Sequence, residues 1–170
     1  MELKGSRNIN ASRETVWEAL NDPEVLKACV PGCSEMIRDD NDGFSAVVTQ
    51  KVGPVKATFK GSVTLADIIP LESYTITGEG KGGAAGFAKG GARVKLADID
   101  EGTELSYEVE ARVGGKLAQI GSRLVDGFAK KTADKFFENF QLAVEAPEDE
   151  ADTADETEAK KKGWFKRMVG

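Results

Sequence analysis

The chain has 170 residues and a mass of 18.2 kDa, which is enough for one domain with a substantial core. It contains no histidine, and this excludes histidine general bases, Ser-His-Asp and Cys-His nucleophile systems, and metal sites that need imidazole. Two cysteines are too few for a disulfide framework, and no apolar leader opens the chain, so we expect a cytoplasmic protein. No stretch approaches the ~20 apolar residues of a transmembrane helix.

The net charge of -6 is unevenly distributed. Residues 145–159 contain eight acids and no base, residues 160–170 contain five bases and no acid, and residues 1–144 carry the remaining -3. An acidic segment without aromatic residues buries too little apolar surface to offset its ordering entropy. We therefore predict a domain over 1–144, an acidic disordered linker over 145–159, and a separate basic segment over 160–170.

The first elements in chain order are a strand and two short helices. Residues 1–9 can form the strand, Ser12 is a helix N-cap, and Asp22 with Pro23 restarts a second helix that ends near Pro31. Extended segments separated by short turns follow, which predicts an antiparallel meander over residues 36–38, 44–52, 55–69, 73–77, 87–98 and 104–113. Residues 117–143 then show helical periodicity, and such a helix would be about 40 Å long.

This order of elements predicts an α+β fold of the helix-grip type. A long amphipathic helix must bury its apolar face, and a curved antiparallel sheet has one apolar face to cover. We therefore expect the helix to lie across the sheet, with a cavity between the two.

Four segments resemble one known family. They are the turn Cys29-Val-Pro-Gly-Cys33, the junction Val52-Gly-Pro-Val55, the glycine-rich stretch 78–91, and the sequence GGKLAQIGSRLV that opens the last helix. Together they resemble the G-subunit family of carbon monoxide dehydrogenases, within the START-like, Bet v 1-like ligand-binding superfamily. The resemblance spans about residues 1–143.

The resemblance implies a non-enzymatic accessory protein of a molybdenum-containing carbon monoxide dehydrogenase. Such a protein would recruit the enzyme to the inner face of the cell membrane and mediate electron delivery to the quinone pool, with a quinone as the bound apolar ligand. Two alternatives stay open. One is an assembly adaptor for a related molybdenum hydroxylase, with a filled core. The other is a small START-like enzyme acting on an apolar substrate, which would need a paired acid and base that the sequence does not identify.

The candidate cavity residues are aromatic and aliphatic, since a quinone needs an apolar slot rather than a charged nucleophile. Gly121 removes a side chain from the apolar helix face, which fits either close helix–sheet packing or room for a flat ligand. The candidates are Trp17, Phe59, Tyr74, Phe87, Tyr107, Leu117, Ile120, Gly121, Leu124 and Phe128.

Two further motifs have alternative interpretations. Seven of the fourteen residues in 78–91 are glycine, and Gly78 to Gly83 match G-x-G-x-x-G, but no helix follows to hold a pyrophosphate. A lid over the cavity or a plain hairpin loop fits this stretch better. Cys29 and Cys33 lack the further ligands of a metal site, so they are small buried hydrophobic residues or a redox pair.

The basic segment has the pattern of a helix that lies in a membrane interface. As a helix, 160–170 would be about 16 Å long, too short to span a bilayer, with apolar residues in one arc and bases around the rest. A solvated tail or a protein-docking peptide is the alternative. The predicted membrane-binding residues are Lys160, Lys161, Lys162, Trp164, Phe165, Lys166, Arg167 and Met168.

Overall fold

Seven antiparallel strands form one curved sheet in the order β1-β7-β6-β5-β4-β3-β2. The computed structural model describes residues 1–39 and 42–145. The strands are β1 (Glu2–Ile9), β2 (Cys33–Asp39), β3 (Gly43–Val52), β4 (Val55–Ile69), β5 (Ser73–Lys81), β6 (Phe87–Ile99) and β7 (Gly102–Gly114). The first strand pairs with the last, so the N-terminal segment lies at one sheet edge and β2 at the other.

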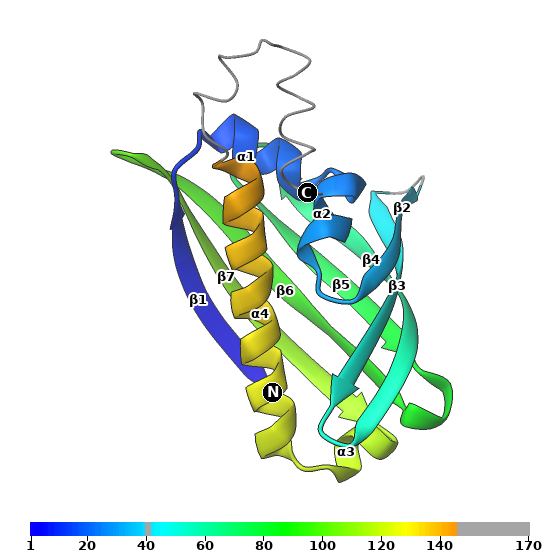
Figure 1. Ribbon diagram of the computed structural model, residues 1–170. Coiled ribbons are helices and arrows are strands. Elements are labelled where there is room, and N and C mark those ends of the chain that lie inside the picture. Colours follow the sequence, from blue (N-terminus) through cyan, green and yellow to red (C-terminus); the bar gives the residue numbers. More distant parts are fainter. Residues whose placement is uncertain (40–41, 146–170) are drawn as a thin grey trace.

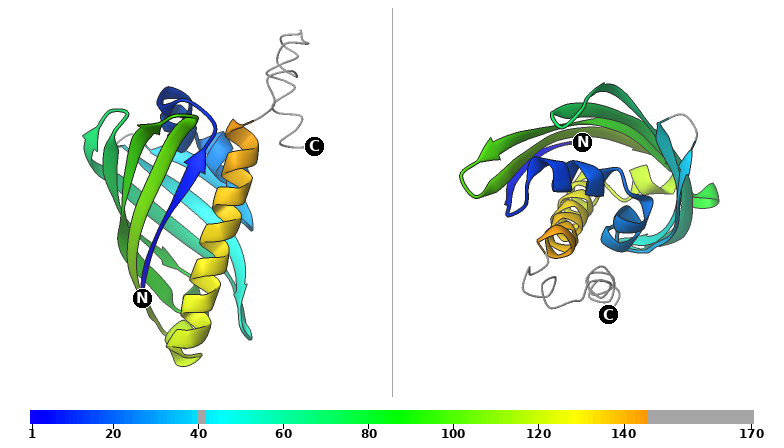
Figure 2. Two further views of the ribbon diagram at one scale, coloured as in Figure 1. Left: turned by 90° about the vertical axis from the view of Figure 1, so that its left-hand side faces the viewer. Right: turned by 90° about the horizontal axis from the view of Figure 1, so that it is seen from above.

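All the helices lie on the concave face or at its ends (Figure 1). They are α1 (Arg13–Leu20), α2 (Pro23–Cys29), the 3-10 turn η1 (Gly83–Ala85), α3 (Lys116–Gln119) and α4 (Ser122–Val144). Figure 2 shows the sheet curving around α4 and α2. The predicted α+β helix-grip fold is therefore confirmed.

The two predicted helix caps are present. The Ser12 hydroxyl accepts a hydrogen bond from the backbone N–H of Thr15 at 3.2 Å, and the Asp22 carboxylate accepts one from Glu24 at 2.9 Å. Each cap satisfies a backbone donor that the first helical turn leaves without a partner. The tandem arrangement of α1 and α2 thus follows from local sequence signals.

The predicted single helix over 117–143 is wrong at its start, because the chain breaks at Gly121. Gly121 has φ +101°, a backbone conformation that side chains with a Cβ rarely adopt, and it separates α3 from α4. The Gly121 N–H donates a hydrogen bond to the Ala118 carbonyl at the end of α3. The Gly121 carbonyl accepts the first hydrogen bond of α4, from the Val125 N–H. Gly121 therefore marks a change of chain direction rather than a gap on a continuous helix face.

The core is concentrated beneath the C-terminal half of α4. Phe140 is fully buried there, and the Phe137 ring stacks on Tyr107 of β7 with 4.9 Å between ring centroids. Helices α1 and α2 contribute Val16 and Val25 to the same cluster. This end of the grip is filled by large side chains.

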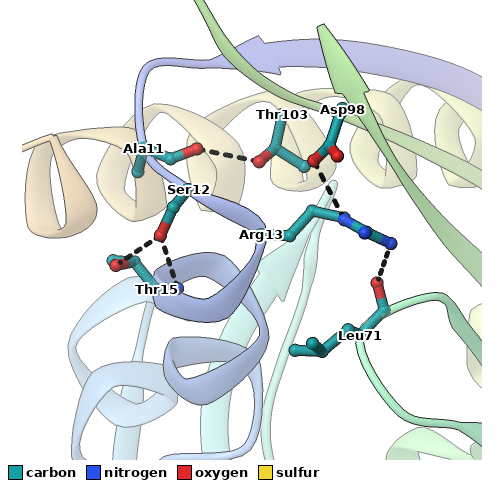
Figure 3. A network of polar contacts seen from close by, with 7 residues as sticks. All are labelled: Ala11, Ser12, Arg13, Thr15, Leu71, Asp98 and Thr103. Carbon is teal, nitrogen blue, oxygen red and sulfur yellow. Dashed lines mark hydrogen bonds and ion pairs between the residues drawn. The ribbon is translucent and has the colours of Figure 1, made fainter.

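A polar network ties α1 to the β6–β7 hairpin above this core (Figure 3). The Arg13 guanidinium contacts the Asp98 carboxylate at 2.9 Å and donates to the Leu71 carbonyl at 3.1 Å. The Thr103 hydroxyl, which is 0% exposed, donates to the Ala11 carbonyl at 2.8 Å. The network fixes the loop between β1 and α1 on the sheet.

We expect Thr103→Val to destabilise the domain by ~1–3 kcal/mol, because it removes the buried hydroxyl and leaves the half-buried Ala11 carbonyl without its donor. Thr103→Ser is the matched control, since it keeps the hydroxyl and removes only a methyl group. The free energy of unfolding, measured by urea denaturation, should fall clearly more for the valine variant. Equal losses for the two variants would show that packing of the methyl group matters and the hydrogen bond does not.

Candidate functional site

Strand alternation divides the sheet into an outer face and a concave face. Leu65, Tyr74, Val94, Leu96 and Leu105 alternate toward the helices and are buried in the core. Their neighbours along each strand point outward, where exposed polar and charged residues predominate. The position of a residue in this alternation therefore decides whether its side chain can face a ligand on the concave face.

The concave face changes from large to small side chains toward the start of α4. One row across the sheet pairs Ala46, Gly61, Gly80 and Ala88 on β3, β4, β5 and β6. The adjacent row continues from Val63 through Gly78, Gly90 and Ala111. Seven glycine and alanine residues thus replace the bulky side chains that fill the other half.

A groove of about 390 Å³ lies over these two rows. On the concave side it is bounded by Phe59 and Val48 toward one edge, and by Ile76 and Val109 toward the core. The side chains that alternate into it are apolar. The charged lining residues, such as Glu79, occupy the alternate strand positions, whose side chains point to the outer face.

Three short segments meet at the end of the grip where α4 begins (Figure 1). Leu117 of α3 and Ala85 of η1 are both buried, and α3 contacts both η1 and β7. A Cβ at Gly53 in the β3–β4 turn would lie 3.4 Å from Leu124 Cδ1, so this turn adjoins the first turn of α4. Together these segments cover the end of the sheet next to the groove.

Several predicted cavity residues belong to the packed core instead of the groove lining. Tyr74 and Tyr107 are buried, and Trp17 of α1 packs edge-on against Tyr74 with 5.4 Å between centroids. Phe59 does line the groove. Phe128 is half-buried on α4.

The predicted residues around the helix break are dispersed. Leu117 is buried, Ile120 is half-buried beside Gly53, and Leu124 is 48% exposed. A Cβ at Gly121 would meet no atom within 4 Å, so this glycine does not form a slot against the sheet.

Phe87 lies on the outer face. It is directly opposite exposed Lys81 on β5, its ring lies on Gly114, and it is 41% exposed. The structure therefore separates Phe87 from the groove by the thickness of the sheet.

Sequence reasoning missed the small residues that form the groove floor. The glycine-rich stretch suggested a loop, yet Gly78 and Gly80 lie in β5 and Gly90 lies in β6. The only part outside the strands is the short connection at 82–86, which contains η1. The alternation of glycine with polar residues at 78–81 was the signal that could have placed these glycines on one face of a strand.

The two cysteines are free in the structure and differ in environment. Cys29 is 1% exposed at the end of α2, and burial raises the pKa of its thiol from 9.0 to about 12. Cys33 is half-buried on β2, and its thiol donates a hydrogen bond to the Glu35 carbonyl at 3.2 Å. Cys29 thus behaves as a small hydrophobic residue at neutral pH, whereas a redox partnership between the two stays a prediction.

The part of the chain that the structure describes holds no cluster of three metal-ligating side chains. Burial also raises the pKa of Tyr74, which keeps its hydroxyl neutral. Within residues 1–39 and 42–145, no helix is both long and apolar enough to cross a membrane. The predicted linker beyond Glu145 and the basic segment 160–170 lie outside the described residues.

Comparison with known proteins places the chain in a family. A family model for the G subunit of carbon monoxide dehydrogenase (CoxG) matches residues 5–145. The chain belongs to the CoxG family. A search of curated proteins found no significant relative. The resemblance noted in the sequence is confirmed.

Solved structures share the CoxG fold described above. A conserved protein from Geobacillus kaustophilus is 32% identical with a TM-score of 0.79, over 85% of this chain and 95% of that chain. Proteins from Chromobacterium violaceum (17% identity, TM-score 0.64, 86% and 99% covered) and Thermus thermophilus (14%, 0.65, 86% and 98%) show the fold alone.

The raised pKa of Cys29 predicts how the free energy of unfolding changes at alkaline pH. Because folding favours the neutral thiol, this contribution is fully present below pH 9 and is lost as the pH rises toward 12. The stability advantage of the wild type over Cys29→Ala should shrink by about 1 kcal/mol per pH unit in that window. Urea unfolding at several pH values measures it. Val25→Ala removes a buried group that does not titrate, so its deficit should stay constant, and a constant deficit for Cys29→Ala would contradict the prediction.

Proposed function

We propose that this chain is an accessory protein of a molybdenum-containing carbon monoxide dehydrogenase that holds a quinone at the inner face of the cell membrane. Membership of the CoxG family supports an accessory role to a carbon monoxide dehydrogenase. The ligand part of the proposal depends on one observation, the two rows of glycine and alanine on the concave face that form the floor of the groove. In this role the domain brings the enzyme to the membrane and links it to the quinone pool.

The groove suits a flat apolar ligand in size and chemistry. Its volume of about 390 Å³ falls within the range typical of small-molecule sites, ~300–1,000 Å³. Glycine leaves the backbone of the floor accessible to a ring, as at Gly80, where a Cβ would have 3.9 Å of clearance from its nearest neighbours. Phe59 and Ile76 would contact the ring or its isoprenoid chain. When bound, the quinone supplies the electron-accepting chemistry, and the apolar side chains hold it and exclude water.

The alternative of a START-like enzyme has less support in this arrangement. General acid–base catalysis needs a positioned acid and base within reach of the substrate. The carboxylates nearest the groove, Glu79 and Glu110, lie in register positions that face outward. The apolar concave lining favours binding over bond-breaking chemistry.

We expect Gly80→Leu to fill the groove and weaken quinone binding. Overpacking costs ~1–3 kcal/mol, which corresponds to a roughly five- to 150-fold loss of affinity. Thr77→Leu is the matched control, because it places the same side chain on the same strand but on the outer face. Fluorescence titration with a short-chain quinone, alongside thermal unfolding, measures both effects. Unchanged affinity in a folded Gly80→Leu protein would move the ligand elsewhere.

Extraction of the purified full chain with organic solvent, followed by mass spectrometry, tests for a bound isoprenoid quinone directly. A quinone recovered from the wild type and reduced in Gly80→Leu supports the carrier role. If the wild type yields none and does not bind added quinone, the adaptor alternative replaces it.

Membrane attachment is the second part of the proposed role, and it predicts the effect of removing residues 160–170. Each base near an anionic surface contributes up to ~1 kcal/mol, and the Trp164–Phe165 pair adds apolar contact. The truncated protein should therefore move largely from anionic vesicles to the supernatant in a sedimentation assay, while the domain stays folded. High salt should weaken binding of the full chain only in part, since the apolar contribution is not screened.

Trp164→Ala combined with Phe165→Ala keeps every charge and separates the two contributions. This variant should bind at low salt and be released at high salt. If the truncated protein sediments with vesicles as well as the full chain does, the basic segment would instead contact a protein partner.

A further inference from the structure

Lysine and arginine are concentrated at one end of the described body. Segments 51–60, 79–89 and 112–123 come together where α4 begins, at the lower end in Figure 1. They contain eight lysine and arginine residues and a single acid, Glu79. The remaining described residues contain ten bases and twenty acids. The body near this end is therefore positive although the chain as a whole is negative.

The sheet register places six of these cations in direct opposition. Lys51 pairs with Lys56 across β3 and β4, Lys60 pairs with Lys81 across β4 and β5, and Lys89 pairs with Arg112 across β6 and β7. All six are exposed, and alternation places them on the outer face. We call these six residues the basic end.

Like charges directly opposite each other destabilise a sheet. At the basic end, the described residues form one ion pair, between Lys81 Nζ and Glu79 Oε2 at 3.5 Å. Farther along the same face Glu108 lies between Lys4 and Arg93, while Glu2 lies opposite Glu110. Within the basic end, three pairs of cations face each other and Glu79, opposite Lys89, is the one acid of the three segments. This excess of cations points to an anionic partner at the basic end.

Exposed apolar side chains accompany these cations. Phe87 lies opposite Lys81, and Leu124 adjoins the β3–β4 turn. Bases surrounding exposed aromatic and aliphatic groups are typical of surfaces that bind anionic bilayers.

The predominance of lysine among these cations favours a lipid partner over a protein partner. Six of the eight bases in the three segments are lysine. Lysine is a flexible point charge that suits a fluid headgroup layer, whereas protein interfaces are enriched in arginine and depleted in lysine. Lys60, Lys81, Lys89 and Arg112 line a depression of about 1370 Å³ on the outer face. The other four cations lie outside it, on the β3–β4 hairpin, α3 and the start of α4, so the positive surface is wider than one pocket.

We infer that the basic end docks on the anionic lipid surface of the membrane, as a contact separate from segment 160–170. The inference rests on the proposed membrane role for the location of the protein, and on the charges of the body for its orientation. Docking in this way would turn the end of the grip beside the groove toward the lipid.

The test uses the full chain and vesicles of phosphatidylcholine and phosphatidylglycerol in equal parts. Lys81→Gln with Lys89→Gln removes two cations of the basic end. Arg93→Gln with Lys95→Gln removes two exposed cations from the upper half of the same face, so the net charge of the two double variants is identical. A cation near an anionic surface contributes up to about five-fold in affinity, so the first variant should bind about ten- to thirty-fold more weakly at about 0.1 M salt. The control should stay within about two-fold, because at ~3.3 Å per residue Arg93 and Lys95 lie roughly 13 and 20 Å along β6 from Lys89, and the Debye length at this salt concentration is ~10 Å.

Thermal unfolding guards against a folding artefact. The two substitutions relieve repulsion with Lys60 and Arg112, and the exposed ion pair between Lys81 and Glu79 that is lost contributes little, so the midpoint for the first variant should not fall below that of the wild type. A lower midpoint together with normal vesicle binding would contradict both the repulsion and the docking.

The remaining outcomes overturn the inference in distinguishable ways. If the wild type binds vesicles and the two double variants bind equally well, attachment depends on segment 160–170 or on net charge, and the proposed membrane role survives. If the wild type does not bind vesicles at all, the membrane role fails as well. If the first variant keeps vesicle binding but loses the dehydrogenase in a pull-down, the basic end binds an acidic protein surface.

Discussion

Aromatic packing between α4 and the sheet holds this helix at one end, and the groove depends on that attachment. The stack of Phe137 on Tyr107, together with fully buried Phe140, sets the distance between helix and sheet. Burial of each such side chain contributes ~1.5–3 kcal/mol, so this half of α4 is firmly placed. Since α4 is about 34 Å long, its other half extends to the end of the grip where the rows that contain Gly80 and Gly78 lie. The side chains of these rows are short, and the groove results from this change in side-chain size.

The fold could be predicted from local signals, and the groove could not. Period-two alternation and the caps at Ser12 and Asp22 are local properties, and the structure matches them. The groove floor depends on register between strands, because Gly80 faces a ligand site only when Gly61 and Ala88 are its neighbours. The face to which a residue such as Phe87 points depends on where its strand begins. The glycines around Phe87 hid the start of this strand in the sequence.

The two ends of the grip are stabilised in different ways. At the core end, side chains distant in sequence hold the elements together, as Arg13 does with Asp98 and Thr103 does with Ala11. At the groove end, α3 has four residues and is followed by the positive-φ residue Gly121. Segments with few buried contacts open most readily, so local unfolding should concentrate beside the groove. A site that must admit and release an apolar molecule benefits from this distribution, because opening there does not disturb the aromatic core.

The titratable groups limit what the domain can do for a bound quinone in the proposed role. Reduction of a quinone takes up protons as well as electrons, and a group that supplies protons near neutral pH must titrate there. The chain has no histidine, and burial holds the thiol of Cys29 and the hydroxyl of Tyr74 in their neutral forms. Among the residues that line the groove, no carboxylate side chain points to the concave face. A domain of this composition can shield and position a quinone, and proton exchange must then take place where the groove meets the enzyme or the membrane.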